Sequence, residues 1–544
     1  MLTRLQVRGF KSLWDVDVRF GPFTCIAGPN AVGKSNLFDA IQFLSRLATD
    51  NFLDAALSIR GAKGLSGNIR DGRSSSGNIR DLFHRWRDQH EKRIFFLAEM
   101  LVPCEGIDSL GQKAEASITS VRYELEIEYA DSGGISGLGT IRLVSEKLTP
   151  IRKGEAARMI RFKHSPSDWR DHVIVGPGRR SPFISTDGNL IRLHQEGNQG
   201  RPRSFNIADL PRTVLSTVNA TESPTSLLVK KEMEAWRLLQ LEPSALRNPD
   251  SFLTPPGLQS DGGHLPATLY ALAHKKPSKK EESIAGHGDI ESFGGGTEAA
   301  QTNGGATETV SLSPEPVLRP QKDKDNDINS IVYEQIAGRL SGLIDDVKSI
   351  LIDRDDKYEC FILALQNFDG TRYEARSLSD GTLRFLALAT LAEDPSALGV
   401  ICMEEPENGI QPSRIPAILK LLKAIACDPT IEVGEDNPLR QVIINTHSPS
   451  VVKLIDPNDL LIAVYEQQVV NHRRFNATVF KWLSQTWRAK SDDRQISPIA
   501  IGRLMSYLEQ VPLEDADEKD PQISQKRLID RADIKQMILP LSAI

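Results

Sequence analysis

The stretch Gly28-Pro29-Asn30-Ala31-Val32-Gly33-Lys34-Ser35 fits the pattern G-x-x-x-x-G-K-[ST], which in other proteins forms a loop around phosphate groups. The pattern has this meaning only where a buried strand precedes it and a helix follows it. Residues 23–27 are apolar and strand-like, and residues 34–47 repeat apolar side chains at helical spacing. Both conditions are met, so we predict a phosphate loop between a strand and a helix.

The chemistry of this loop follows from its residue types. The glycines let backbone N–H groups turn toward phosphate oxygens, and the N-terminus of the helix adds a partial positive charge at the same place. Lys34 would then bridge the β- and γ-phosphates, and Ser35 would ligate Mg²⁺. The alternative is an ordinary glycine-rich turn between a strand and a helix.

Length and composition describe the class of protein. A chain of 544 residues is too long for one compact core, and 40% hydrophobic with 25% charged residues is typical of a soluble globular protein. No apolar run reaches membrane-spanning length, and residues 1–8 lack the apolar core of a signal peptide, so a cytoplasmic location is expected. Five cysteines without C-x-x-C spacing indicate neither disulfides nor zinc: Cys25, Cys104, Cys360, Cys402 and Cys427.

The net charge of −6 argues against a chain-wide affinity for nucleic acid but leaves room for a local basic patch. The favoured interpretation of each short basic run is a solvated loop, and DNA or RNA binding is the alternative. These runs are Arg179-Arg180, Arg201-Pro202-Arg203, Lys230-Lys231 and Arg473-Arg474.

The N-terminal 150 residues read as one lobe. After the phosphate loop, the ranges 94–101, 121–129 and 141–148 are strand-like, and the second alternates apolar and polar residues cleanly. We predict half-exposed antiparallel strands, with 141–148 paired to 121–129. The six-residue segment Ser66–Asp71 recurs at Ser76–Asp81, which indicates a small loop duplication because two copies are too few for a repeat fold.

The middle of the chain is predicted as three segments. Residues 151–274 form an inserted mixed region with a helical apolar stripe from Leu227 to Leu239. Residues 275–327 are rich in glycine and charge and poor in large apolar side chains, so we expect a disordered linker. Residues 328–375 return to the main body through a helix and a strand, and the helix has an apolar face from Ile331 to Ile350. Heptads are absent, which excludes a long coiled coil.

Three further motifs follow. Leu378-Ser379-Asp380-Gly381-Thr382 opens a helix, where it suits either an anion or simple capping. An apolar strand over 398–403 ends in Glu404-Glu405-Pro406-Glu407-Asn408, and a second strand over 441–445 ends in Thr446-His447-Ser448-Pro449. Ligands of α/β sheets lie at such strand ends, although the histidine alone could be an ordinary loop residue.

In this order the motifs strongly resemble the ATPase domains of the SMC/RecF/OLD group of the ABC superfamily, and Arg8–Ser12 resembles the group's N-terminal strand. The resemblance is specific over residues 1–50 and 375–465. It implies an α/β fold: an ABC-type P-loop ATPase head with an antiparallel β lobe, an inserted mainly helical region and a disordered linker. The second ATPase lobe would span 376–485, followed by a helical tail over 486–544.

The resemblance also implies roles. ATP would bind at Gly28, Pro29, Asn30, Ala31, Val32, Gly33, Lys34, Ser35 and Asn36. Ser35 and Glu404 would hold Mg²⁺, while Glu405, His447 and Lys34 would carry catalysis. Glu405 would polarise the attacking water, and His447 would contact the γ-phosphate. Ser379 and Gly381 would close over the nucleotide of a second subunit. Many relatives have Asp at position 404 and His at position 411, where this chain has Glu and Gln, so slow turnover is expected.

Four functions remain open. The preferred one is an ATP-driven switch in prokaryotic antiphage defence, a homodimer or higher homo-oligomer that controls a separate effector protein such as a nuclease, with DNA or RNA as a further partner and no membrane. The alternatives are an ATP-gated scaffold with little turnover, a RecF-like repair ATPase, and the nucleotide-binding subunit of a transporter, which the long spacing between motifs disfavours.

A nuclease site within this chain is considered separately, because OLD relatives carry a Toprim nuclease after the ATPase. Glu466 follows a strand-like run, and Asp515 and Asp517 have suitable spacing. The two aspartates lie in an acidic run without a buried strand before it, however, so a solvated turn is favoured. We predict that this chain contains no nuclease.

Overall fold

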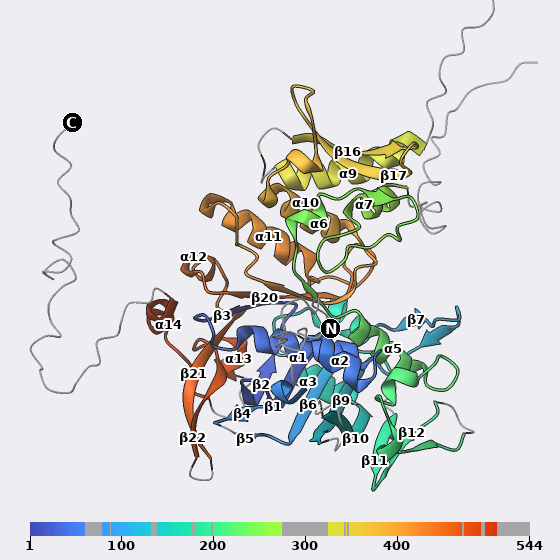
Figure 1. Ribbon diagram of the computed structural model, residues 1–544, viewed down its shortest axis with the longest axis vertical. Coiled ribbons are helices and arrows are strands. Elements are labelled where there is room, and N and C mark those ends of the chain that lie inside the picture. Colours follow the sequence, from blue (N-terminus) through green and yellow to red (C-terminus); the bar gives the residue numbers. More distant parts are fainter. Residues whose placement is uncertain are drawn as a thin grey trace, which may run out of the picture.

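Figure 1 shows the computed structural model of the chain. The structure describes residues 1–59, 79–87, 89–131, 139–176, 181–196, 200–274, 325–341, 344, 347–470, 473–490 and 496–508. Several predictions fall outside these residues: the first copy of the duplicated segment, the linker up to residue 324, Arg179-Arg180, Asp515 and Asp517. The last residues of the predicted linker, 325–327, lie within helix α9.

One lobe is built on an eight-stranded antiparallel sheet with the order β13-β12-β11-β10-β9-β6-β1-β2. The strands are β1 Leu2–Phe10, β2 Leu13–Arg19, β6 Arg93–Leu101, β9 Ser120–Ala130, β10 Thr140–Pro150, β11 Ile184–Asp187, β12 Leu190–Leu193 and β13 Arg203–Asn206. The predicted pairing of β9 with β10 is confirmed, and Tyr123, Leu125 and Ile127 of β9 are buried on one face.

The second sheet has six strands in the order β14-β19-β20-β3-β21-β22, of which the first five are parallel and β22 is antiparallel to β21. Parallel strands bring their carboxyl ends to one edge of the sheet, which positions the loops that follow them side by side. The strands are β3 Phe23–Ala27, β14 Arg237–Leu239, β19 Gly399–Glu404, β20 Arg440–Thr446, β21 Leu460–Val470 and β22 Arg473–Lys481.

The parallel sheet is buried on both faces. In β3, Ile26 packs into the core shared with helix α1 (Lys34–Leu47) and the antiparallel sheet. Its neighbours Cys25 and Ala27 pack into a second core with α10 (Asp380–Glu393) and α11 (Ile415–Ile425). In Figure 1, β20 crosses the middle of the molecule with α10 and α11 on one side and α1 on the other. Burial on both faces explains the continuous apolar runs of these strands.

The remaining elements complete both sides. The helices are α2 Phe52–Ser58, α3 Lys153–Met159, α4 Asp171–Val173, α5 Pro224–Glu234, α6 Pro243–Leu246, α7 Leu265–Ala273, α9 Asp325–Ser341, α12 Pro449–Val452, α13 Trp487–Lys490 and α14 Ile501–Leu508. A further sheet contains β15 Asp250–Ser251, β16 Val347–Asp355, β17 Cys360–Asn367 and β18 Arg372–Glu374. The short hairpins are β4 Arg85–Trp86 with β5 Gln89–His90, and β7 Glu105–Ile107 with β8 Lys113–Glu115.

The predicted fold class, an α/β P-loop head with an antiparallel β lobe, is confirmed. The inserted region 151–274 contains strands as well as helices, since β11, β12 and β13 extend the antiparallel sheet and β14 joins the parallel one. In the described part of the chain, no helix has both the length and the apolar character needed to cross a membrane.

Two helices end earlier than the apolar periodicity predicts. The stripe from Leu227 to Leu239 is helical only to Glu234, because residues 237–239 form β14 on the free edge of β19. The face from Ile331 to Ile350 is helical only to Ser341, and β16 begins at Val347. In both cases the few apolar residues beyond the helix fit either the helical or the strand spacing. Pairing with a neighbouring strand decides their conformation.

A buried carboxyl joins the antiparallel sheet to the inserted region. Glu146 of β10 accepts hydrogen bonds from the backbone N–H groups of Val214 (2.7 Å) and Leu215 (2.9 Å) and from the Tyr123 hydroxyl (3.1 Å). Burial raises the pKa of Glu146 from 4.5 to about 7, against the opposing effect of these donors.

The raised pKa predicts a pH-dependent stability. Between about pH 4.5 and pH 7 the folded chain binds this proton more tightly than the unfolded chain, so the contribution of Glu146 to the free energy of unfolding falls as pH rises. Over this whole pH range, Glu146 changes the free energy of unfolding by at most about 3 kcal/mol. In denaturant unfolding between pH 5 and pH 8, the free energy of unfolding of wild type should fall relative to that of Glu146→Gln as pH rises. Parallel pH profiles would contradict this prediction.

Candidate functional site

The phosphate loop and the motifs that follow β19 and β20 meet around one cleft at the carboxyl ends of β3, β19 and β20. The cleft has a volume of ≈ 460 Å³. Its lining residues come from segments hundreds of positions apart in the sequence, which the parallel sheet brings to one edge. They are Asn30, Ala31, Gly33, Lys34, Ser35, Asn36, Glu404, Glu405, Asn408 and Asn445.

The phosphate loop has a backbone shape that leaves little room for larger residues. Gly33 has φ of 95° and immediately precedes α1, and a Cβ at this position would lie 2.3 Å from the Ser12 hydroxyl. A Cβ at Gly28 would lie 2.5 Å from the carbonyl oxygen of Ala463. Within the described residues no side chain caps α1, so its first N–H groups can face an anion.

Lys34 is folded back onto its own loop. Its side chain is buried, and Nζ donates to the carbonyl oxygens of Gly28 (2.6 Å) and Pro29 (2.8 Å). Burial lowers the pKa of Lys34, while nearby Glu405 and Glu404 act in the opposite direction. Binding of a phosphate to Lys34 is therefore favourable, because phosphate oxygens accept stronger, charge-assisted hydrogen bonds than carbonyl groups do.

Glu405 is held on both carboxylate oxygens. Its Oε1 lies 2.7 Å from Nδ1 of His447, and its Oε2 accepts a hydrogen bond from Nδ2 of Asn408 (2.7 Å). Its backbone has φ of 45°, an uncommon value for a non-glycine residue, and its N–H donates to the carbonyl (3.0 Å) and Oδ1 (3.1 Å) of Asn445. Contacts from the ends of β19 and β20 therefore fix one carboxylate in the lining of the cleft.

Glu404 and Ser35 line the same cleft, and Nδ2 of Asn445 donates to Oε1 of Glu404 at 3.4 Å. Among the described residues no group of three or more His, Cys, Asp or Glu side chains could hold a metal ion. Mg²⁺ in nucleotide sites usually takes one or two protein oxygens and completes its shell with phosphate and water. One carboxylate and one hydroxyl therefore fit Mg²⁺ bound together with a nucleotide.

A third glutamate, Glu407, stabilises the turn after β19. Glu407 is buried, and its Oε1 accepts a hydrogen bond from the Thr446 hydroxyl. Burial is the main cause that raises the pKa of Glu407. Thr446 also accepts from the N–H of Ser448 at 2.9 Å. This pair ties the Glu404-Glu405 turn to the His447 turn, a role that sequence reasoning missed although both residues lie inside the quoted motifs.

Ser379 and Gly381 lie outside this cleft. Ser379 is the N-cap of α10, and its hydroxyl accepts a hydrogen bond from the N–H of Thr382 at 3.2 Å. A Cβ at Gly381 would lie 3.7 Å from the carbonyl oxygen of Gly409. Among the described residues that line the cleft, none comes from 378–382. The structure thus brings most of the predicted residues together but not these two.

Sequence reasoning also missed two residues whose side chains donate hydrogen bonds to the backbone of the phosphate loop. The Tyr465 hydroxyl donates to the carbonyl of Ala31 (2.7 Å), and the Thr478 hydroxyl donates to the carbonyl of Val32 (2.8 Å). Both side chains come from the β21–β22 hairpin, more than 400 residues away. Only spatial proximity could have identified them.

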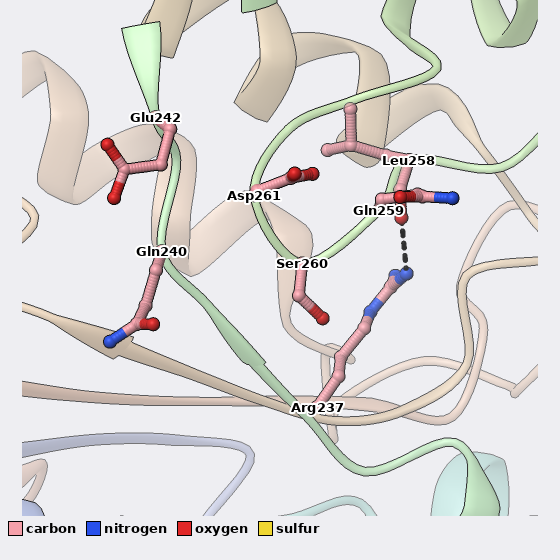
Figure 2. A pocket seen from close by; sticks show the side chains of 7 residues that line it. All are labelled: Arg237, Gln240, Glu242, Leu258, Gln259, Ser260 and Asp261. Carbon is pink, nitrogen blue, oxygen red and sulfur yellow. Dashed lines mark hydrogen bonds between the residues drawn. The ribbon is translucent and has the colours of Figure 1, made fainter. Parts of the chain in front are cut away.

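A second cavity, of ≈ 560 Å³, lies beside β14 (Figure 2). Figure 2 shows Arg237 reaching from β14 to the loop over 258–261, where its Nη1 donates to the Leu258 carbonyl at 3.2 Å. Its Nε and Nη2 have no hydrogen-bond partner among the residues that the structure describes, and burial lowers its pKa. The lining of this cavity shares no residue with the lining of the cleft around Lys34.

Parts of this chain are similar to known proteins. Residues 23–96 and 306–453 match a family described as "AAA domain, putative AbiEii toxin, Type IV TA system". These ranges contain Lys34, Ser379, Glu404, Glu405 and His447. A protein named "OLD nuclease" from Thermus scotoductus is 48% identical over 44 residues, which is only 8% of this chain and 8% of that relative.

Solved structures of SMC heads are similar at low identity. An SMC head bound to the C-terminal winged-helix domain of ScpA is 12% identical, with 88% of this chain and 97% of that chain covered and a TM-score of 0.39. The Pyrococcus furiosus head with an extended coiled coil is 11% identical, with coverages of 94% and 99% and a TM-score of 0.39. The family match, the short OLD relative and the motifs support an ATPase of the SMC/OLD type.

Proposed function

We propose that this protein binds and hydrolyses ATP as an ABC-type switch that dimerises on ATP and controls a partner effector. One observation carries the proposal. Glu405 is held between His447 and Asn408 in the cleft that also contains the phosphate-loop lysine, Lys34. A fixed carboxylate opposite a phosphate-binding cation is the arrangement that phosphoryl transfer to water requires.

In the proposed reaction the chain mainly supplies position and charge. Lys34 would exchange the Gly28 and Pro29 carbonyls for phosphate oxygens, and Glu405 would accept a hydrogen bond from the attacking water. His447, which lies against Glu405, would orient that carboxylate and contact the terminal phosphate. Mg²⁺, held by Ser35 and Glu404, would neutralise developing charge on the phosphates when bound.

The proposed dimer completes the site. Ser379 and Gly381 lie outside the cleft of their own chain, whereas the N-terminus of α10 suits an anion. A second copy placed head to tail would present its Ser379 to the nucleotide held by Lys34, so that two nucleotides lie between two chains. In this arrangement each ATP would contact both chains and so stabilise the dimer.

The partner and setting are also proposals. The matched family's description names the AbiEii toxin and a Type IV TA system, and one relative is named OLD nuclease. Both names favour a role in prokaryotic defence, with a nuclease as the effector type. Glu466, considered above for a nuclease site, lies inside β21, and its carboxylate forms an ion pair with the side chain of Lys481 in β22. This position favours a structural role for Glu466 and a nuclease on a separate protein.

A phosphate-release assay tests the proposed activity. With saturating ATP and Mg²⁺, wild type should release phosphate repeatedly, with slow turnover because Glu404 and Gln411 differ from the residues common in relatives. An ATP-gated scaffold would bind ATP with at most one turnover per chain. Absence of both binding and release would refute the proposed function.

A further inference from the structure

One cross-strand pair of side chains donates hydrogen bonds to two consecutive carbonyl groups of the phosphate loop. Tyr465 of β21 and Thr478 of β22 are direct register partners in the antiparallel hairpin, so their side chains share a face. The Tyr465 hydroxyl donates to the carbonyl of Ala31 at 2.7 Å, and the Thr478 hydroxyl donates to the carbonyl of Val32 at 2.8 Å.

The direction of these carbonyls fixes the direction of the neighbouring N–H groups. In a trans peptide the C=O and the following N–H point to opposite sides of the chain. Since the carbonyls of Ala31 and Val32 face the hairpin, the N–H groups of Val32 and Gly33 face away from it. Ala31 and Gly33 line the cleft, so this side is the one on which a phosphate would be bound.

Thr478 is itself positioned by a directed chain of hydrogen bonds. Its single hydroxyl proton goes to Val32, so in the contact between Thr478 and Ser12 (2.8 Å) the Ser12 hydroxyl is the donor. Ser12 in turn accepts from Nδ2 of Asn36 (2.7 Å), in the first turn of α1. The chain Asn36 to Ser12 to Thr478 to Val32 starts and ends on the phosphate loop and its helix, with every hydroxyl used once as donor.

The same two hydroxyls explain why position 33 is glycine. A Cβ there would lie 2.3 Å from the Ser12 oxygen and 2.4 Å from the Thr478 oxygen. Ala31, with φ of 63°, holds a backbone conformation that is uncommon for residues with a Cβ, and the hydrogen bond from Tyr465 stabilises it. The loop shape thus depends on contacts from outside the loop.

We propose that Tyr465 and Thr478 are positioning residues of the nucleotide site, which hold two peptides of the phosphate loop with their N–H groups toward the phosphates. The inference rests on the proposed ATP-binding function and adds the β21–β22 hairpin to its machinery. Without these hydroxyls the loop can rotate its peptides, and ATP binding must then meet the cost of ordering them.

The test compares ATP affinity, measured by calorimetric titration with Mg²⁺, in wild type, Tyr465→Phe, Thr478→Val and Thr478→Ser. Loss of one hydroxyl should raise the Kd for ATP about 3- to 10-fold in Tyr465→Phe and in Thr478→Val. Thr478→Ser keeps the hydroxyl and should bind like wild type. Asn476→Ala, an exposed position on the same face two residues from Thr478, is the matched control and should also bind like wild type.

Steady-state kinetics separate positioning from general damage. KM for ATP should rise with Kd, while kcat at saturating ATP stays within about 2-fold, because ATP itself restores the loop once bound. Tyr465 is half exposed, so Tyr465→Phe should fold normally even if Thr478→Val loses stability. Wild-type Kd and KM in both folded variants would overturn the inference. Failure of wild type to bind ATP would instead overturn the proposed function on which it rests.

Discussion

Glu405→Gln should slow ATP hydrolysis by roughly 10²- to 10⁴-fold and leave the affinity for ATP close to that of wild type. The amide has the shape of the carboxylate and keeps an oxygen for the hydrogen bond from Asn408, so the turn should persist. It cannot accept a proton from water as a carboxylate does. Phosphate release at saturating ATP, together with a binding titration, measures the two effects separately.

A Glu→Gln change elsewhere is the control for this prediction. Glu374 is exposed in β18 and lines no part of the cleft, so Glu374→Gln should hydrolyse ATP at the wild-type rate. If Glu405→Gln also retains the wild-type rate, Glu405 is not the residue that activates water, and the contact with His447 would have only a structural meaning.

Lys34→Ala should weaken ATP binding by about 10²-fold, since the variant loses a charged donor to the phosphates in a partly dehydrated site. In the free protein the change also removes the donor to the carbonyls of Gly28 and Pro29, and a positive charge that interacts with Glu404 and Glu405. A titration with ATP and Mg²⁺ measures the loss of affinity.

The matched control for Lys34 is Lys420, an exposed lysine of α11 that lines no part of the cleft. Lys420→Ala should bind ATP with the wild-type Kd. Equal affinities for Lys34→Ala and Lys420→Ala would show that ATP binds elsewhere, and the cleft would then need another ligand.

The elements nearest the site were predictable because several independent signals coincide there. The predicted strand 23–27 and helix 34–47 match β3 and α1, and the strands before Glu404 and Thr446 lie within about one residue of the predicted bounds. Each of the three strands is an apolar run that ends at a motif: the phosphate loop, the acidic turn after Glu404, or Thr446-His447-Ser448-Pro449. Length, composition and the turn that follows therefore agree. The misplaced segments, 237–239 and 347–350, lack such a following motif.

The site was predictable only as far as its motifs. Lys34, Ser35, Glu404 and Glu405 line one cleft because the strands that carry them are neighbours, which motif order and the parallel-sheet rule imply. Tyr465 and Thr478 were not predictable, because a phenol and a hydroxyl on an alternating hairpin carry no local sign of their distant partners. Their contacts depend on how the hairpin edge of the sheet packs against the phosphate loop.

In the proposed dimer, one chain holds only half of each nucleotide site. Multi-angle light scattering of Glu405→Gln, with and without saturating ATP and Mg²⁺, tests this arrangement. The proposed function predicts one chain's mass without ATP and twice that mass with ATP, with the doubling lost when Lys34→Ala is added. A molar mass of one chain at every ATP concentration, in protein shown to bind ATP, would contradict the claim.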